Sequence, residues 1–261
     1  MKTKAVIFDL DDTLIPSVRD VLRALSATLT PVAERYDKAP DELVVTMRST
    51  AREIWRASDL HPYCERVGIA SYEGLWATPV ANSDEARQLS EWLPEYRLHA
   101  WRSALKRQGI EEEGLAEHLA ATFPTERRRR AGPFPEIETV LNHLKESYRL
   151  ALLTNGEVGL QNEKLDLSGL RHHFEVVTVS GEIGIGKPDR QVFDLTLKRL
   201  GLTVDAAVMV GDNLRTDISG ALGIGMFSAW INRDGRTGDD TIRPDAELAD
   251  LTELAGAIPN I

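Results

Sequence analysis

The sequence predicts an α/β protein with a parallel sheet, covering helices and an inserted helical segment. An apolar, strand-like run covers residues 4–10, and from about residue 131 onward short β-type runs alternate with helical patterns. This order is typical of parallel strands joined by crossover helices. Between these parts, residues 17–130 show long helical patterns and no convincing strand. We therefore expect a core formed by residues 1–16 and 131–261, interrupted by a helical domain over residues 17–130.

Four β-type runs and two helices can be assigned in the C-terminal part of the core. The runs are RLALLTN (149–155), EVVTVS (175–180), AAVMVGD (206–212) and MFSAW (226–230). One helix is expected over residues 137–144, where apolar residues follow the i, i+3, i+4, i+7 spacing of a single helical face. The other begins after Asp189, which is suited to an N-cap, and ends at Gly201.

Apolar stripes predict the helices of the inserted segment. One stripe runs from Leu22 to Tyr36, and another follows Ser83 and runs from Leu89 to Ala100. Pro31 and Pro94 should kink or divide these helices. Four of the five tryptophans and four of the five tyrosines lie in this segment, so most of them are expected to pack between helices. Three further prolines at the borders suit the stiff crossings of a hinged domain: Pro16, Pro133 and Pro135.

The composition limits the class of protein. A chain of 261 residues with 42% hydrophobic residues can bury a substantial core. Its formal charge of -10 argues against nonspecific nucleic-acid binding, which needs a basic surface. No apolar stretch approaches the roughly 20 residues that span a bilayer, and Cys64 is the only cysteine, which excludes an intramolecular disulfide. We expect a cytoplasmic protein that binds neither nucleic acid nor membrane, with Cys64 in a packing role.

Two groups of basic residues receive structural interpretations. The run from Arg127 to Arg130 follows a helix-like segment over residues 111–123, and a solvated helix end is favoured over a phosphate-binding patch. The six histidines include the adjacent His172 and His173. Because the histidines are dispersed and lack acidic residues at ligand spacing, surface or packing roles are favoured over a transition-metal site.

A pair of carboxylates follows the first apolar run. Residues 6–14 read VIFDLDDTL and place Asp9 and Asp11 two positions apart, so both side chains leave the strand on the same face and can reach one pocket. Two carboxylates this close repel each other, which favours a divalent metal ion, a raised pKa on one partner, or both. One carboxylate can then attack a substrate while the other carries a proton.

Further polar residues follow the later strand-like runs. They are Thr154 and Asn155 in LLTNG, Lys187 in GEIGIGKPD, and Asp212 and Asp217 in VGDNLRTDISGA. In an open α/β sheet, ligands bind outside the carboxyl ends of the strands, so these side chains could converge with the first carboxylate pair on one crevice.

One motif in this region indicates a different chemistry and is excluded. Residues 181–187 match the G-x-x-x-x-G-K part of a phosphate-binding P-loop. The next residue is Pro188, which supplies neither the hydroxyl group that would ligate magnesium nor an amide proton. An NTPase is therefore disfavoured, and a dinucleotide enzyme is disfavoured because no G-x-G-x-x-G fingerprint is present.

The motifs as a set resemble the haloacid dehalogenase-like hydrolase superfamily, in its phosphatase branch with a helical cap. They are DLDDT (9–13), Thr154, Lys187 followed by Pro188, and GDNLRTD (211–217), in that order. The resemblance covers essentially the whole chain. It implies a Rossmann-like catalytic core with the helical domain as its cap. It also implies a Mg²⁺-dependent phosphatase that hydrolyses the phosphomonoester of a small soluble metabolite through an aspartyl-phosphate.

The resemblance assigns the nucleophile, the proton carrier and the metal ligands. Asp9 would be the nucleophile, and Asp11 would protonate the leaving oxygen and then deprotonate the attacking water. Mg²⁺ would be held by Asp9, the backbone carbonyl of Asp11, and Asp212. Asp12 is better suited to shaping the loop than to the chemistry.

The resemblance also assigns the phosphate-binding and supporting residues. Thr154, Asn155 and Lys187 would bind the phosphate oxygens. Asp217 and Asn213 would have supporting roles, Asp217 by orienting Lys187 or a metal-bound water.

Two alternative functions remain open from the sequence. A phosphomutase of the β-phosphoglucomutase type would use the same core residues, and a catalytically silent phospho-ligand-binding module would keep the fold without turnover. Cleavage of carbon–halogen bonds is disfavoured, because dehalogenating relatives lack an acid at the position of Asp11. Within the family, three features resemble those of nucleotide and sugar-phosphate phosphatases: the DDTL motif, the TNG motif after the second strand, and the long cap.

Overall fold

The computed structural model describes residues 3–258, which form two compact units. The sheet unit contains the described residues of Met1–Pro16, Gly132–Gly156 and Gln161–Ile261. The helical unit contains Ser17–Ala131 together with Glu157–Leu160. The short segment Glu157–Leu160 thus groups with the helical unit although it lies far along the chain, which the hydrophobic pattern did not indicate.

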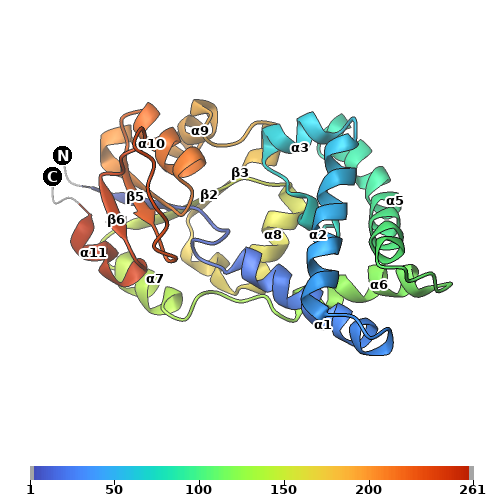
Figure 1. Cartoon of the computed structure of the whole chain (residues 1–261). Helices are drawn as coiled ribbons and strands as arrows, with labels where there is room; N and C mark the ends of the chain where they lie inside the picture. Colours follow the sequence, from blue (N-terminus) through green and yellow to red (C-terminus); the bar gives the residue numbers. More distant parts are fainter. Residues whose placement is uncertain (1–2, 259–261) are drawn as a thin grey trace. The chain divides into compact units, whose positions relative to one another are not determined.

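A six-stranded parallel sheet lies at the centre of the sheet unit (Figure 1). The strand order is β3-β2-β1-β4-β5-β6, and each neighbouring pair is parallel. Val6 lies opposite Leu150 on one side and Val208 on the other. The predicted α/β class is therefore confirmed. The strands are β1 (Ala5–Phe8), β2 (Arg149–Thr154), β3 (Val176–Val179), β4 (Ala207–Gly211), β5 (Phe227–Ile231) and β6 (Ala246–Leu248).

Both faces of the sheet are covered, because alternate residues of each strand point to opposite sides. On one face, Val6 and Phe8 of β1 pack in a core cluster with Leu141. On the other face, Ala5 and Ile7 of the same strand pack in a cluster with residues of helix α9 (Arg190–Leu200). This double burial explains why the central strands read as continuous apolar runs.

The helices of the sheet unit connect the strands. Asp189 caps the N-terminus of α9 by accepting a hydrogen bond from the amide of Gln191, and Gly201 ends that helix in the left-handed conformation at φ 64°, as predicted. The α-helices are α7 (Ile137–Lys145), α8 (Val158–Leu167), α9 (Arg190–Leu200), α10 (Ser219–Gly223) and α11 (Leu254–Ala257). Single turns are η1 (Leu170–His173), η2 (Ser180–Glu182), η3 (Val204–Ala206), the π-turn η4 (Leu214–Ile218) and η5 (Leu251–Glu253).

Six helices form the helical unit. They are α1 (Ser17–Arg35), α2 (Pro40–Ala57), α3 (His61–Val67), α4 (Ser71–Gly74), α5 (Asp84–Arg107) and α6 (Leu115–Arg128). Ser83 caps α5 by accepting a hydrogen bond from the amide of Ala86. Over the described part of the chain, no helix is long and apolar enough to cross a membrane.

Aromatic residues and Cys64 lie in the interior of the helical unit. Trp55, Trp101 and Tyr96 are buried, and the rings of Trp55 and Tyr96 meet edge to face at 5.0 Å. Cys64 is also buried, and desolvation raises the pKa of its thiol to about 12. The predicted packing roles are therefore confirmed for these residues.

The prolines within helices do not divide them. Helix α1 continues through Pro31 and α5 continues through Pro94, so of the two expected outcomes, a kink or a division, the division does not occur. A single proline removes one backbone hydrogen bond of a helix. Burial of Leu25 and Leu29 on one side of Pro31, and of Val32 on the other, anchors both halves of α1 to the same core.

The interpretation of the basic run is wrong for its first residue. Arg127 is 1% exposed, although it lies in the last turn of α6. Its guanidinium lies over the ring of Trp76 at 4.9 Å and 3.9 Å from a carboxylate oxygen of Asp20. A cation–π contact and a buried carboxylate replace the solvent that a helix-end arginine usually contacts.

We expect Gly74→Ala to destabilise the helical unit. A Cβ atom at position 74 would lie 2.4 Å from the Trp55 ring and 2.9 Å from the Tyr96 ring, so packed aromatic side chains would have to move. Overpacking of this kind costs about 1–3 kcal/mol. Urea unfolding should show this loss, while Gly132→Ala, whose Cβ would meet nothing within 4 Å among the described residues, should leave the midpoint nearly unchanged. Equal midpoints for both variants would contradict the packing described here.

Candidate active site

The candidate site lies where three neighbouring strands end. Asp9 follows β1, Thr154 is the last residue of β2, and Asp212 follows β4. Strand β1 lies between β2 and β4, and the strand order changes direction beside it. Ligands of open α/β sheets bind at such a switch point, outside the carboxyl ends of the strands. The sheet therefore brings together residues from distant parts of the chain.

Asp9 is fixed by its backbone and its side chain. Its amide donates to the carbonyl of Val210 at 2.9 Å, and the hydroxyl of Thr13 donates to Asp9 Oδ2 at 3.3 Å. The following turn contains Asp12 in the left-handed conformation at φ 58°, with its amide donating to the carbonyl of Ile15. This turn carries the chain away from the strand while the Asp9 carboxylate stays buried.

The ammonium group of Lys187 is enclosed by three acceptors. Its Nζ atom lies 2.6 Å from Asp9 Oδ1, 2.7 Å from Asp217 Oδ1 and 2.7 Å from the carbonyl oxygen of Leu153. An ammonium has three N–H donors, so these contacts match its full capacity. Desolvating an ion costs several kcal/mol, and the two carboxylates and the carbonyl compensate for that cost.

Burial and charge act in opposite directions on this group. Desolvation raises the pKa of Asp9 well above its ordinary value, and the charge of Lys187 partly lowers it. For Lys187, desolvation acts to lower the pKa, but the charges of Asp217 and Asp9 outweigh it and raise the pKa overall. Lys187 is therefore cationic throughout the physiological range, whereas Asp9 depends on nearby positive charge to remain ionised.

Asp212 occupies a similar environment beyond β4. Desolvation, followed by the charges of Asp217 and Asp12, raises the pKa of Asp212 to about 7. Arg236 opposes this rise, because its Nη2 atom lies 3.3 Å from Asp212 Oδ2. The Asp212 backbone is also held, since its carbonyl accepts hydrogen bonds from Trp230 Nε1 at 2.8 Å and Arg236 Nη2 at 2.6 Å.

The carboxylates of the site can hold a small divalent cation. Carboxylate oxygens of Asp9, Asp212 and Asp217 all lie within 4.8 Å of one another. Asp217 is already engaged, because Lys187 contacts Oδ1 and the amide of Asn213 donates to Oδ2 at 3.0 Å. Asp9 and Asp212 are therefore the better candidates for ligands. Hard oxygen donors with an excess of negative charge fit Mg²⁺.

Asp11 is held by a helix that the motifs did not indicate. Lys164 Nζ lies 2.8 and 2.9 Å from the two carboxylate oxygens of Asp11, and Gln161 Nε2 donates to Oδ2 at 2.8 Å. The same Gln161 nitrogen lies 2.6 Å from the Thr154 hydroxyl oxygen. Lys164 is buried. These contacts fix the Asp11 carboxylate beside the end of β2.

The two asparagines of the predicted site hold loops. The side chain of Asn155 accepts from the amide of Lys187 at 2.7 Å and donates to its carbonyl at 3.0 Å. Asn213 caps the turn after β4 by accepting from the amide of Arg215 at 2.9 Å. The Asn155 side chain is thus used to join the β2 and Lys187 loops, and the Asn213 side chain shapes the Asp217 turn.

Two glycines allow close approach within the site. A Cβ atom at Gly211 would lie 2.3 Å from a carboxylate oxygen of Asp217, and one at Gly186 would lie 2.8 Å from the Asn155 amide. Contacts shorter than 3.0 Å cannot be accommodated without movement. These positions therefore require glycine because other side chains of the site occupy the space.

Sequence reasoning missed Gln161, Lys164 and Arg236. Gln161 and Lys164 are three residues apart on α8, which follows the Thr154 strand, and an i, i+3 polar pair on one helical face was a usable signal. Arg236 lies in an irregular segment between β5 and β6. No spacing rule connects that segment to Asp212.

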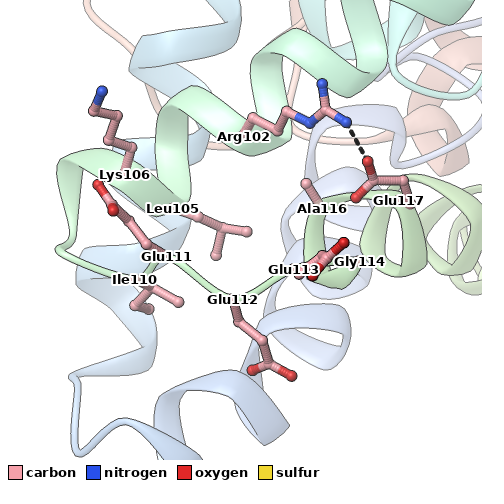
Figure 2. A pocket seen from close by; sticks show the side chains of 10 residues that line it. All are labelled: Arg102, Leu105, Lys106, Ile110, Glu111, Glu112, Glu113, Gly114, Ala116 and Glu117. Carbon is pink, nitrogen blue, oxygen red and sulfur yellow. Dashed lines mark hydrogen bonds and ion pairs between the residues drawn. The ribbon is translucent and has the colours of Figure 1, made fainter.

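A pocket in the helical unit is distinct from the candidate site. It has a volume of about 440 Å³ and is lined by residues between Arg102 and Glu117 (Figure 2). Its charged lining includes Glu111, Glu112 and Glu113, and Arg102 is paired with Glu117. A pocket with this excess of carboxylates is poorly suited to a phosphate anion.

The chain matches the model of the haloacid dehalogenase-like hydrolase family over residues 3–225. This match covers most of the chain, so the protein belongs to that family. The predictions of the family and of a hydrolase are therefore confirmed.

Relatives with named activities agree with the narrower prediction of a phosphoric monoester hydrolase. The chain is 36% identical over 252 residues to phosphoserine phosphatase of Thermus thermophilus, covering 96% of this chain and 97% of the relative. It is 29% identical to glyceraldehyde 3-phosphate phosphatase of Methanopyrus kandleri, covering 98% and 97%. It is 25% identical to N-acylneuraminate-9-phosphatase of Mus musculus, covering 90% and 85%.

Solved structures support the fold. The HAD-hydrolase YfnB of Bacillus subtilis, bound to magnesium, is similar with a TM-score of 0.68 at 21% identity, covering 100% of both chains. A HAD phosphatase of Thermococcus onnurineus is similar with a TM-score of 0.59 at 26% identity, covering 99% of both chains.

We expect Lys187→Met to destabilise the sheet unit strongly. The substitution leaves Asp9 and Asp217 as buried carboxylates without their shared cation. Removing one partner of a buried ion pair costs about 3–5 kcal/mol. Denaturant unfolding should show this loss. The matched control is Lys198→Met on the exposed side of α9, which should change the unfolding free energy by at most about 0.5 kcal/mol. A similar effect of both substitutions would refute the central role of the Lys187 contacts.

Proposed function

We propose that this protein is a Mg²⁺-dependent phosphatase that hydrolyses phosphomonoesters of small metabolites through an aspartyl-phosphate on Asp9. The contact between Asp9 Oδ1 and Lys187 Nζ at 2.6 Å is the observation that carries the proposal. An attacking carboxylate and an anionic phosphate repel each other, so the reaction needs fixed positive charge beside the nucleophile. The buried ammonium of Lys187 supplies that charge.

The proposed reaction has two steps that share one proton carrier. In the first, an oxygen of Asp9 attacks phosphorus, the bond from phosphorus to the leaving oxygen breaks, and Asp11 donates its proton to that oxygen. In the second, water attacks the phosphorus of the aspartyl-phosphate, Asp11 accepts the proton of the water, and Asp9 is regenerated as inorganic phosphate leaves. Asp11 thus acts first as general acid and then as general base.

Asp9, Asp212 and the backbone carbonyl of Asp11 are the proposed Mg²⁺ ligands. When bound, the ion would offset the repulsion between the nucleophile and the phosphate and stabilise the charge on the transferring group. The raised pKa values of Asp9 and Asp212 support this assignment, because both show desolvated carboxylates whose ionised forms a cation would stabilise.

Thr154 is proposed to donate to a phosphate oxygen. Lys187 is proposed to stabilise the phosphate by its charge, and the N–H that contacts Asp9 would turn to a phosphate oxygen when Asp9 attacks phosphorus. The Thr154 oxygen accepts a hydrogen bond from Gln161, which leaves its own O–H group to donate to phosphate. Asn155 would contribute by holding the Lys187 loop through its two backbone hydrogen bonds. Asp217 would orient Lys187. The backbone amide of Asn213 would in turn orient Asp217 by donating to its carboxylate.

Lys164 and Gln161 are proposed as positioning residues for Asp11. Their three hydrogen bonds fix the direction in which the Asp11 carboxylate presents its oxygens. Proton transfer is sensitive to this direction, because the carrier must lie within hydrogen-bond reach of the leaving oxygen.

The substrate class is proposed to be a small phosphorylated metabolite, with residues 17–130 acting as the cap that selects it. The named relatives act on such compounds, and phosphoserine is the first candidate because that relative is 36% identical over nearly the whole of both chains. The core residues would serve any phosphomonoester, so selection must depend on residues outside them.

We expect Asp9→Asn to abolish phosphatase activity while the protein stays folded. The amide is not a competent nucleophile, so release of inorganic phosphate from p-nitrophenyl phosphate and phosphoserine should fall by more than about 10⁴-fold. The wild type should lose activity with EDTA and regain it with Mg²⁺. Release of inorganic phosphate, without transfer to a sugar hydroxyl, also separates hydrolysis from the phosphomutase alternative.

The matched control for this experiment is Asp194→Asn. Asp194 is an exposed residue of α9 that pairs with Arg190, so its amide variant should keep wild-type turnover. Substantial activity of Asp9→Asn under conditions where circular dichroism shows a native fold would refute the nucleophile assignment.

We expect Lys164→Met to slow substrates with poor leaving groups selectively. An alkyl phosphate such as phosphoserine requires protonation of its leaving oxygen, whereas p-nitrophenolate leaves readily without it. Loss of the Asp11 contacts should reduce the first-turnover rate of leaving-group release from phosphoserine by about 10- to 100-fold, a part of the 10²–10⁴-fold that general acid–base catalysis supplies.

The comparison of substrates distinguishes positioning from a purely structural role. The comparison uses leaving-group release in the first turnover, because hydrolysis of the aspartyl-phosphate also needs Asp11 and is common to both substrates. An equal loss of first-turnover release from p-nitrophenyl phosphate and phosphoserine in Lys164→Met would indicate a structural defect and would contradict the proposed role of Lys164. Asp11→Asn should show the same selectivity as Lys164→Met with a larger effect, and Lys198→Met should show none.

A further inference from the structure

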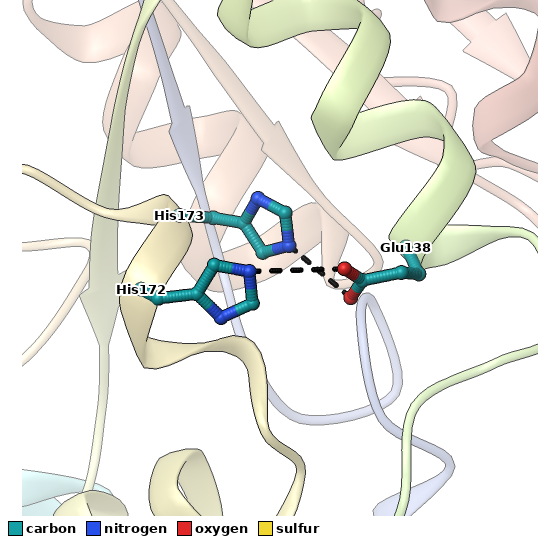
Figure 3. A group of neighbouring side chains, drawn as sticks. All are labelled: Glu138, His172 and His173. Carbon is teal, nitrogen blue, oxygen red and sulfur yellow. Dashed lines mark ion pairs between the residues drawn. The ribbon is translucent and has the colours of Figure 1, made fainter.

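A second cluster of ligand-type side chains lies in the sheet unit, away from the proposed catalytic residues. Glu138 projects from α7, and His172 and His173 project from η1 toward it (Figure 3). The Nε2 atom of His173 lies 3.1 Å from Glu138 Oε2, and the Nε2 atom of His172 lies 3.7 Å from Glu138 Oε1. The sequence spacing gave no sign of this acidic residue, because folding brings Glu138 to the histidines from another helix.

The hydrogen bonding of His172 fixes where its free electron pair lies. Its Nδ1 atom is 2.9 Å from the carbonyl oxygen of Gly169. A carbonyl can only accept, so Nδ1 carries the proton. In the neutral ring, Nε2 then has a lone pair, and this lone pair faces a carboxylate of Glu138 that also only accepts. The contact is favourable only when a proton or a metal ion lies between the two atoms. A backbone carbonyl on the remote ring nitrogen is also the usual arrangement of a metal-binding histidine.

His173 provides an independent indication. Its side chain is fully buried, yet within the described residues neither ring nitrogen has an aligned hydrogen-bond partner. Buried polar atoms without partners are rare in folded proteins and call for an explanation such as a missing ion. Although Nε2 is 3.1 Å from Glu138, it is not aligned with that oxygen as a hydrogen bond requires. Two ligands of one metal ion lie close together in this way without being aligned for a hydrogen bond, because each points at the ion.

We propose that Glu138, His172 and His173 form a binding site for a transition metal ion of the Zn²⁺ class. Zinc binds histidine nitrogen and carboxylate oxygen at about 2.0–2.2 Å in tetrahedral geometry, which places neighbouring ligand atoms about 3.3–3.5 Å apart. The two separations of 3.1 and 3.7 Å bracket this value, and one donor atom from each residue lies within 4.8 Å of the others.

The composition of the cluster distinguishes its ion from the one proposed for Asp9 and Asp212. Two imidazoles and one carboxylate suit zinc, copper or nickel, whereas Mg²⁺ prefers oxygen ligands. Glu138 and His172 are more than half exposed at their side chains, so an ion can enter from solvent and a water molecule can complete the coordination. Three protein ligands with one open position leave room for that water.

The site would join α7 to η1. A metal ion that binds only the folded arrangement of these segments stabilises it by mass action.

The test is Zn²⁺ binding to the full-length protein, measured by equilibrium dialysis with excess Mg²⁺ present to occupy oxygen-ligand sites. The wild type should bind one Zn²⁺, and thermal unfolding should shift to higher temperature as Zn²⁺ is added. Glu138→Gln and His172→Gln should each bind Zn²⁺ about 10- to 100-fold more weakly and lose the thermal shift. Both substitutions are at exposed side chains and should leave the fold and the basal phosphatase activity unchanged.

Two matched variants locate the ion. His143→Gln removes an exposed histidine on α7. His143 lies 3.8 Å from Glu146, and the described residues supply no third donor there, so this variant should bind Zn²⁺ as the wild type does. Asp212→Asn removes a carboxylate of the catalytic site and should also keep the Zn²⁺ affinity. Absence of Zn²⁺ binding by the wild type, or equal affinity of the wild type, Glu138→Gln and His172→Gln, would overturn the proposal.

Discussion

The buried ammonium of Lys187 is the constraint on which the candidate-site end of the sheet depends. It contacts Asp9 after β1, the carbonyl of Leu153 in β2 and Asp217 in the turn after β4. Lys187 Nζ therefore contacts groups at the ends of three neighbouring strands. A buried ion is tolerated only when its partners surround it, so the loop that carries Lys187 and the turn that carries Asp217 must both reach their native positions before this end of the sheet is stable.

The same constraint produces the chemistry proposed for the site. Carboxylates that are close together and desolvated tend to take up protons, and burial raises the pKa of both Asp9 and Asp212. A protonated acid is a poor nucleophile. Lys187 counteracts this tendency at Asp9, and a divalent cation would do so at both residues. The site thus holds negative charge that is stabilised only by cations, which is also the condition for binding an anionic phosphate.

Sequence reasoning predicted the family, the fold class and the general position of the site, because these depend on patterns that lie close together along the chain. Asp9 and Asp11 share one motif, and strand ends in a parallel sheet meet at one edge. Contacts between side chains that are far apart in the sequence could not be predicted in this way. Lys164 reaches Asp11 from helix α8, which the sequence analysis did not assign. Arg127 is buried because it contacts Trp76 and Asp20. Glu138 meets His172 only in the folded chain. The short strand β6, three residues long, gave too little periodicity to be recognised.

The absence of a side chain at Gly211 is itself a structural requirement of the site. The space that a side chain would fill at that position is occupied by the Asp217 carboxylate, and Asp217 in turn holds Lys187. Glycine at the end of β4 therefore carries no reacting group, yet it is as indispensable to the geometry as the acid beside it. A substitution at this position would act through crowding and not through the loss of a reacting group, so an inactive variant there would not show participation in the reaction.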